Sequence, residues 1–154
     1  MRTMAKIGYS ARDIEEETTA RALGRELPIS PKKAVELCRA LRGRSVEDAK
    51  AYLERVIALK QPVPMRRYKT MVAHKHGTGP ARYPVKVARH MLRVLQSAEE
   101  NAGYKGLEVD NMRIKVLSAH KGSTTKGRMP RAQGRSTPWN QETVNLEVVL
   151  EEVE

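Results

Sequence analysis

Several residue types are scarce or missing in this sequence. There is no phenylalanine and only one tryptophan, so a hydrophobic core must be built mainly from Leu, Val, Ile, Met and Ala. Cys38 is the only cysteine, which excludes an intramolecular disulfide and a zinc site of four cysteines and favours a reducing cytosol. No apolar run reaches the roughly 20 residues of a membrane span, and the N-terminus lacks the apolar stretch of a secretory signal. We therefore expect a soluble cytoplasmic protein with a modest core.

Acidic residues are missing from two long stretches of the chain. The sequence of 154 residues has 29 Lys and Arg against 18 Asp and Glu, which gives a formal net charge of +11 at pH 7. Two long stretches, residues 55–98 and 111–141, contain neither Asp nor Glu. A single basic patch is often only a solvated face, but ordinary soluble surfaces intersperse both signs of charge over longer distances. Two acid-free blocks of this length therefore predict contact with nucleic acid.

The residues after position 30 carry the signals of a first helix. Ser30 can cap the unpaired amides of a first turn, and Pro31 fits there because that position needs no amide donor. Apolar residues then recur at helical spacing as far as Gly43, which is a typical helix end. We predict a helix over residues 31–42, with Cys38 on its apolar face as a buried small hydrophobe and not a nucleophile.

A second helix and a long loop should follow. Ser45 and Asp48 stand three positions apart, as in a capping box, and an apolar stripe continues over residues 46–60. Pro62 stops this helix. The stretch 62–83 has no periodicity and contains glycine and proline, which predicts a long ordered loop or arm.

The third predicted helix has one face for the core and one for an anion. Pro84 opens it, and Gly103 is its expected end. The apolar positions on one side of the helical wheel are Ala88, Met91, Leu92, Leu95, Ala98 and Ala102. The positions gathered on the other side are Lys86, Arg89, His90 and Arg93.

Alternation of apolar and polar residues predicts two half-buried strands, over residues 112–116 and 144–150. Their outward charges are of opposite sign, which favours antiparallel pairing of the two strands. Such pairing would set Arg113 and Lys115 across from Glu147 or Glu151. The C-terminal part of the chain should therefore contain an antiparallel β-sheet.

Two further segments have no clear periodicity. The first, residues 1–27, is expected to hold a short strand around Ile7 and Tyr9, followed by a loosely structured lead-in as far as Leu27. The second, residues 118–141, is rich in glycine and proline and has almost no large apolar residue. A free loop of that length inside a compact domain is uncommon and is usually functional or disordered. We expect this segment to project away from the core.

The positions of the basic residues along the chain favour RNA over DNA as the binding partner. Helices that read DNA usually carry base-reading Asn or Gln, whereas the basic face of the third helix suits phosphates. The glycine-rich stretches 62–83 and 121–135 have few bulky side chains, so they can thread into a folded RNA and become ordered on it. Trp139 is expected either to stack on a base or to pack at the base of the projecting segment.

No catalytic, metal or nucleotide site is expected. His74 and His76 flank a lysine and have no nearby carboxylate or cysteine, so they suit phosphate or ribose better than a metal or acid–base chemistry. The segment from Gly122 to Gly127 superficially suggests a phosphate-binding loop. However, the order Gly-x-x-x-x-Gly-Lys-Ser/Thr is absent, and no helix is predicted after it.

Four short motifs point to a known family. They are VPMRRY at residues 63–68, GPARYP at 79–84, SAEENA at 97–102 and MPRAQGR at 129–135. The last is close to an Arg-Pro-Arg-Ala-x-Gly-Arg signature, with Met129 standing where that family often has an aromatic residue or Arg. Over almost its whole length, the sequence resembles the archaeal type of the universal large-subunit ribosomal protein 22 family.

The resemblance implies an α+β fold in which three helices pack on a small three-stranded antiparallel sheet, with a long extended β-hairpin. It implies a structural, non-enzymatic constituent of the large ribosomal subunit in the cytoplasm, which binds ribosomal RNA and supports subunit assembly. Its expected partners are large-subunit ribosomal RNA, neighbouring ribosomal proteins including protein 4, and the nascent polypeptide. No cofactor, metal, membrane or small-molecule substrate is expected.

Carried onto this chain, the resemblance implies one domain over residues 1–154. A basic loop would lie at about 62–83 and a hairpin arm at about 112–152, with a tip at about 127–134 that lines the polypeptide exit tunnel. The expected RNA-binding residues are Arg66, Arg67, Lys69, Lys75, Arg82, Lys86, Arg89, Arg93, Lys121, Lys126, Arg128, Arg131 and Arg135. The expected tunnel-lining residues are Arg128, Met129, Pro130, Arg131 and Ala132.

The sequence is also compatible with two other functions. The first is a free-standing regulator that binds messenger or structured RNA without a ribosome. The second is an RNA-modifying or RNA-cleaving enzyme, which would need a positioned carboxylate or a cofactor loop inside the basic blocks. Neither block contains an Asp or Glu, so no residue is expected to be catalytic.

Overall fold

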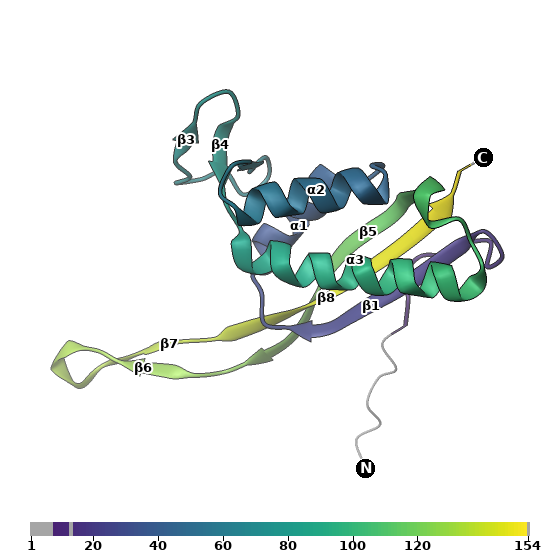
Figure 1. Cartoon of the computed structure of the whole chain (residues 1–154). Coiled ribbons are helices and arrows are strands. Elements are labelled where there is room, and N and C mark those ends of the chain that lie inside the picture. Colours follow the sequence, from purple (N-terminus) through teal and green to yellow (C-terminus); the bar gives the residue numbers. More distant parts are fainter. Residues whose placement is uncertain (1–7, 13, 154) are drawn as a thin grey trace, which may run out of the picture.

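A three-stranded antiparallel sheet forms the base of the fold. The computed structural model describes residues 8–12 and 14–153. The sheet has the strand order β1-β8-β5, with β1 at Thr19–Leu27, β8 at Gln141–Glu152 and β5 at Met112–Thr125. The helices are α1 (Pro31–Leu41), α2 (Val46–Ile57) and α3 (Val85–Lys105). Figure 1 shows all three helices on the same side of the sheet, which confirms the expected α+β architecture.

The hydrophobic core lies between the sheet and the helices. The central strand β8 contributes Leu146, Val148 and Leu150, all of which are fully buried. The predicted apolar face of α3 is confirmed, because every member is buried except the partly buried Leu92. Burial of each such large apolar side chain stabilises the fold by about 1.5–3 kcal/mol. None of the helices in the described part of the chain is long and apolar enough to cross a membrane.

The expectation of a loosely structured lead-in is wrong for residues 19–27, which form the edge strand β1. This strand comes close to α3 because it carries Gly24. A Cβ atom at Gly24 would lie 2.8 Å from Cγ2 of Val94 on that helix. Tyr9 lies in no strand, and Ile7 falls outside the described residues.

Helix α3 also ends later than expected. It continues through Gly103 and ends at Lys105, where Gly106 adopts the left-handed conformation with φ of 80°. The amide of Gly106 donates to the carbonyl of Gly103 over 3.1 Å and closes the last turn. The ammonium of Lys105 holds this turn against the chain before β1, because it donates to the carbonyls of Glu16 (2.8 Å) and Thr19 (2.9 Å).

Helices α1 and α2 begin where they were expected. The amide of Asp48 donates to Oγ of Ser45 over 3.2 Å, which confirms the cap of α2. The expected cap by the side chain of Ser30 is wrong, because that hydroxyl makes no capping hydrogen bond to α1. The two helices end at Leu41 and Ile57, slightly earlier than predicted.

Strands β5 and β8 form a long hairpin arm, residues 112–152, and its far part extends beyond the three-stranded sheet. At its far end β6 (Arg128–Pro130) pairs antiparallel with β7 (Ser136–Pro138), and a short 3-10 turn, η2 (Ala132–Gly134), joins them. Figure 1 shows this end extending away from the helices and the sheet. We call residues 121–142 the distal arm; none of them is buried.

The basic loop, residues 62–83, forms a second and smaller projection. It contains β2 (Val63–Pro64), β3 (His74–Lys75) and β4 (Gly79–Arg82), in the order β2-β4-β3. In Figure 1, β3 and β4 project at the same end of the molecule as the distal arm, away from the C-terminus. The 3-10 turn η1 (Val109–Asn111) leads from α3 into β5. The two basic projections therefore leave one end of the body.

The charges across β5 and β8 are paired as the sequence suggested, with one difference. Arg113 lies opposite Glu151 in the register, and Lys115 forms an ion pair with the same carboxylate. Glu147 has another role, because it is only 1% exposed and accepts a hydrogen bond from the hydroxyl of Ser10 over 2.6 Å. The chain before β1 is thereby fastened to the outer face of the sheet.

Candidate nucleic-acid interface

The predicted RNA-binding cations fall on three surfaces. The basic loop carries Arg66, Arg67, Lys69, Lys75 and Arg82. Helix α3 carries Lys86, Arg89 and Arg93. The distal arm carries Lys121, Lys126, Arg128, Arg131 and Arg135. All of these residues are exposed except Lys75, which is half-buried.

Most of these cations have no carboxylate partner. Among residues 8–12 and 14–153, the one member of the set that forms an ion pair is Lys121, whose Nζ lies 2.7 Å from Oε1 of Glu142. Lys75 is held differently, with its Nζ 5.6 Å from the ring centroid of Tyr83. The remaining cations are not compensated by a carboxylate within the described residues.

A buried carboxylate holds the basic loop against α1. Glu36 is only 1% exposed, and its Oε1 accepts hydrogen bonds from the amides of Arg67 (2.6 Å) and Tyr68 (2.9 Å). Burial alone raises the pKa of this carboxyl, but the amides of Tyr68, Arg67 and Arg66 and the charge of Arg39 together hold the pKa of Glu36 below its usual value. Glu36 is therefore ionised at neutral pH, and it fixes the loop from which Arg66 and Arg67 project.

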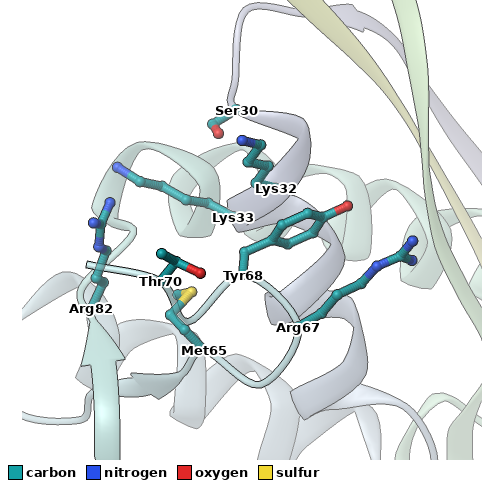
Figure 2. A pocket seen from close by; sticks show the side chains of 8 residues that line it. All are labelled: Ser30, Lys32, Lys33, Met65, Arg67, Tyr68, Thr70 and Arg82. Atoms are coloured by element: carbon teal, nitrogen blue, oxygen red, sulfur yellow. The ribbon is translucent and has the colours of Figure 1, made fainter. Parts of the chain in front are cut away.

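A cavity of about 280 Å³ opens between the start of α1 and the basic loop (Figure 2). Its lining residues are Ser30, Lys32, Lys33, Met65, Arg67, Tyr68, Thr70 and Arg82. In Figure 2, Lys33 and Arg82 extend toward the same side, while Lys32 and Arg67 lie on either side of Tyr68. Nζ of Lys32 is 5.7 Å, and Cζ of Arg67 is 5.5 Å, from the centre of the Tyr68 ring. We call this the first cavity.

The electrostatics of the first cavity suit a phosphate. No carboxylate is among its lining residues, and the first turn of α1 contains no acid. The start of a helix carries a partial positive charge, so cations such as Lys32 and Lys33 are unfavourable there unless an anion lies nearby. Arg67 and Arg82 from the basic loop add two further cations with several donors each. A phosphate group would relieve the mutual repulsion of these four side chains.

The exposed face of α3 is a second cationic surface. His90 lies between Lys86 and Arg93 along this helix and is half-buried. Burial lowers the pKa of His90, and the charges of Arg93 and Lys86 lower the pKa further. The imidazole is therefore neutral at pH 7, and Lys86, Arg89 and Arg93 provide the charge of this face.

The distal arm orients some of its cations by hydrogen bonds across the hairpin. Nη1 of Arg128 donates to Oγ of Ser136 over 3.2 Å, and Nε of Arg131 donates to Oγ1 of Thr137 over 3.1 Å. The turn itself is closed by the Arg131 amide, which donates to the carbonyl of Arg135 over 2.8 Å. These bonds hold the guanidinium groups of Arg128 and Arg131 against side chains of the opposite strand, β7.

Trp139 lies on the distal arm beside Gly127. Its amide donates to the carbonyl of Gly127 over 2.7 Å, and its side chain remains 51% exposed. A hollow of about 390 Å³ adjoins this point and is lined by Lys126, Gly127, Arg128, Pro138 and Asn140. A half-exposed indole next to cations is suited to stacking on a base, so both expected roles of Trp139 stay open.

The residues considered for nucleophilic chemistry or metal binding lie in surroundings that favour neither. Cys38 is buried as predicted, and burial raises the pKa of its thiol to about 12, so it is not a reactive thiolate. His74 lies on β3 and His76 in the following turn. Within the described ranges, no three His, Cys, Asp or Glu side chains are grouped so that they could hold a metal ion.

Sequence reasoning missed three residues of this interface: Lys32, Lys33 and Glu36. The two lysines carried a usable signal, because they occupy a first helical turn in which acids are normally favoured. Glu36 carried little signal. An acid next to the apolar residue Leu37 is ordinary in an amphipathic helix, and its amide partners lie about thirty positions away in the chain.

Known proteins resemble this chain over most of its length. A family model described as ribosomal protein L22p/L17e matches residues 22–151. The chain is 53% identical over 153 residues to a protein of Methanothrix thermoacetophila named large ribosomal subunit protein uL22, with 97% of this chain and 99% of that protein covered. A protein of the same name from Ignicoccus hospitalis is 51% identical over 144 residues, covering 90% and 91%.

A third relative, from Methanocaldococcus jannaschii and also named large ribosomal subunit protein uL22, is 48% identical over 152 residues and covers 97% of each chain. These similarities confirm the resemblance that the four sequence motifs suggested. The chain belongs to the ribosomal protein L22p/L17e family, whose members are structural and not enzymatic components of the ribosome.

Proposed function

We propose that this chain, a structural constituent of the large ribosomal subunit in the cytoplasm, binds ribosomal RNA through its three basic surfaces and supports assembly of the subunit. The observation that carries the proposal is the distal arm. None of its residues is buried, and four of its five cations have no carboxylate partner within the described chain. A ribbon of this kind gains little from the hydrophobic effect, so phosphates around it would supply most of the stabilisation of its shape.

The body and the two projections would have different tasks in this binding. The body presents the basic face of α3, whereas the basic loop and the distal arm leave the same end of the molecule (Figure 1). Cations on two projections can reach phosphates of RNA segments that converge between them. The protein would thereby join RNA segments that would otherwise repel one another, which is how it would support assembly.

We extend the proposal to the tip of the hairpin arm, at about residues 127–134. Arg128, Met129, Pro130, Arg131 and Ala132 would line the polypeptide exit tunnel, beside large-subunit protein 4 and the nascent polypeptide. The narrow shape of the arm supports this role, because a ribbon of two strands can pass between RNA helices. Arg128 and Arg131 carry all of the charge among these five residues, because Met129, Pro130 and Ala132 are uncharged.

We also propose that residues 1–154 act as one ribosomal-protein domain, with the basic loop at 62–83 and the hairpin arm at 112–152. The continuity of the arm with the sheet supports this division. Strands β5 and β8 both extend from the buried sheet into the distal arm and stay paired there, with one shift in register between Lys121 and Thr124. The arm would therefore be held in a fixed direction by the body.

Crosslinking in purified large subunits tests these proposals. A photoreactive residue at Arg66 should crosslink to ribosomal RNA, and one at Arg131 should crosslink to ribosomal RNA and to a nascent chain held in the tunnel. Arg66 serves as the control for Arg131, because the basic loop should not reach the nascent chain. If Arg131 gave no RNA crosslinks in intact subunits, the proposed role of the arm would be wrong.

Sedimentation separates this function from that of a free-standing RNA regulator. A subunit constituent should remain with the large subunits at high salt, because contacts distributed over three surfaces do not dissociate together. Recovery of most of the protein in a free fraction, detached from ribosomal particles, would contradict the proposal. The same fractions would show whether RNA is cut or modified, which an enzyme would cause.

A further inference from the structure

The two faces of the distal arm differ in charge. One register holds along this part of the hairpin, with Thr125 opposite Gln141 and Arg128 opposite Pro138. Successive residues of a strand point to opposite faces, and residues directly opposite each other share a face. One face therefore carries Lys126, Arg128, Pro130, Ser136, Pro138 and Asn140. The other face, which we call the uncharged face, carries Thr125, Gly127, Met129, Thr137, Trp139 and Gln141.

Hydrogen bonds place one arginine of the arm on each face. Nη1 of Arg128 donates to Oγ of Ser136 over 3.2 Å, which keeps this guanidinium on the cationic face. Nε of Arg131 donates to Oγ1 of Thr137 over 3.1 Å, which places the second guanidinium at the tip end of the uncharged face. The uncharged face thus has a positive charge at its border.

Trp139 is the largest side chain of the uncharged face and the only tryptophan of the protein. Its neighbour directly across the ribbon is Gly127, and the Trp139 amide donates to the Gly127 carbonyl over 2.7 Å. Because glycine has no side chain, no side chain directly opposite covers the indole, which is 51% exposed. The distal arm has no buried residue, so it offers the indole no core to pack into. An aromatic surface is therefore available to a partner.

The surroundings of Trp139 favour a nucleobase as that partner. No acid lies between Asn111 and Gln141, and Lys126 and Arg128 lie on the opposite face of the same short ribbon. Proteins that bind single-stranded nucleic acid combine an aromatic surface for a base with cations for the adjoining phosphates. Trp139 also lies six positions after Gln133 in the turn, which at the usual rise of a strand is roughly 20 Å from the tip. If the tip lines the tunnel, Trp139 lies where RNA surrounds the arm and not where a nascent chain passes.

We propose that an unpaired RNA base stacks on the indole of Trp139, while Lys126 and Arg128 contact phosphates along the cationic face. The contact accepts any of the four bases, because every base has an aromatic face. One side of the arm thus holds a base, and the other side follows the RNA backbone. This inference rests on the proposed RNA binding and deepens it.

The test compares two oligomers of equal length and charge. The full chain is titrated with a single-stranded uridine oligomer and with an oligomer of the same ribose phosphates that has no bases. Wild-type protein should bind the uridine oligomer roughly tenfold more tightly, the size expected for one stacked base. Trp139→Ala should bring this ratio close to one, whereas Trp139→Phe keeps an aromatic face and should keep most of it. Tyr104→Ala is the matched control, because it removes a 94% exposed aromatic ring from α3 and should leave the ratio unchanged.

Tryptophan fluorescence gives a second readout, because all of the signal comes from Trp139. The uridine oligomer should quench this fluorescence, and the oligomer without bases should not. A tenfold ratio that persists in Trp139→Ala, or fluorescence that responds to an apolar peptide and not to the uridine oligomer, would overturn the inference. Either result together with normal affinity for ribosomal RNA would leave the proposed function standing. Failure of the wild-type protein to bind ribosomal RNA would instead contradict the proposed function itself.

Discussion

The hairpin arm passes through two environments, and they differ in what holds the strands together. In the body, every residue of β8 from 144 to 150 is buried. In the distal arm, no residue between 121 and 142 is buried, and the two strands are joined by backbone pairing and a few side-chain hydrogen bonds. The same pair of strands is therefore stabilised by apolar packing at one end only. Thus the contacts that stabilise the fold and the proposed RNA contacts lie in different parts of one hairpin.

The two regions also use charge differently. In the body, carboxylates serve the protein itself: Glu36 and Glu147 are buried acceptors of backbone amides, and Glu151 pairs with Lys115. The distal arm contains one acid, Glu142, at its very base. Charge in the body is thus largely compensated from within, whereas charge in the distal arm is not. Mutations in the two regions should therefore affect different measurements.

The largest expected effect is on the stability of the body. Leu146→Ala removes a fully buried side chain of the central strand, so it should lower the free energy of unfolding by about 3 kcal/mol. Met129→Ala, in the distal arm, should change the same quantity by less than about 0.5 kcal/mol. Denaturant unfolding of the two variants gives both values. Similar losses at the two sites would mean that the distal arm belongs to the cooperative core.

The next effect is on RNA binding and should leave stability unchanged. Replacing Arg128, Arg131 and Arg135 together by Ala removes three exposed cations and no core contact. Affinity for ribosomal RNA at low salt should fall on the order of tenfold, and the slope of log affinity against log salt should become shallower by about two. The corresponding triple change to Lys keeps the charge and should keep the slope. An unchanged slope in the Ala variant would show that the arm does not contact phosphates.

A smaller effect concerns the carboxylate that fastens the N-terminal segment to the body. Burial raises the pKa of Glu147, but the Ser10 hydroxyl, the amides of Ala11 and Ser10 and the charge of His120 together lower that pKa below its usual value. A carboxyl whose pKa is lower in the folded state stabilises the fold above its ordinary pKa. This stabilisation is lost as the pH falls through the folded-state value.

Glu147→Gln should therefore lower the free energy of unfolding at pH 7 by roughly 1 kcal/mol, because the acceptor remains but its charge is gone. It should also make stability fall less steeply than in the wild type as the pH drops below about 4.5. Glu151→Gln breaks a partly exposed ion pair and should cost at most about 0.5 kcal/mol. Equal acid sensitivity of the wild type and Glu147→Gln would show that Glu147 carries no such linkage.

Sequence patterns predicted the helices and the arm because both depend on local information. The apolar stripe of α3 and the glycine-rich, acid-free run before Glu142 are visible without a structure. Strand β1 was missed because its buried positions, Thr19, Ala20 and Ala22, are small and do not form a strong apolar alternation. Its burial depends on the close approach of α3 at Gly24, which is tertiary information.

The exposed basic residues of the candidate interface could be predicted from the sequence, but their arrangement in space could not. The exposed cations could be identified from the two acid-free stretches, because basic residues without acidic neighbours in the sequence are easy to recognise. The first cavity could not be predicted, because it joins α1 to a loop about thirty residues later in the chain. The burial of the Glu36 carboxylate against the amides of Arg67 and Tyr68 is likewise a contact between distant parts of the chain.

The smallest expected effect is confined to the distal arm. A Cβ atom at Gly127 would lie 2.7 Å from the carbonyl oxygen of Trp139, so Gly127→Ala must push the two strands apart at this point. The hydrogen bond from the Trp139 amide to the Gly127 carbonyl should weaken, and that amide should exchange with solvent faster. The Val144 amide, which belongs to the buried part of β8, should exchange at the wild-type rate. If both amides exchanged faster, the arm and the body would open together, and the division between a stabilising body and an RNA-binding arm would fail.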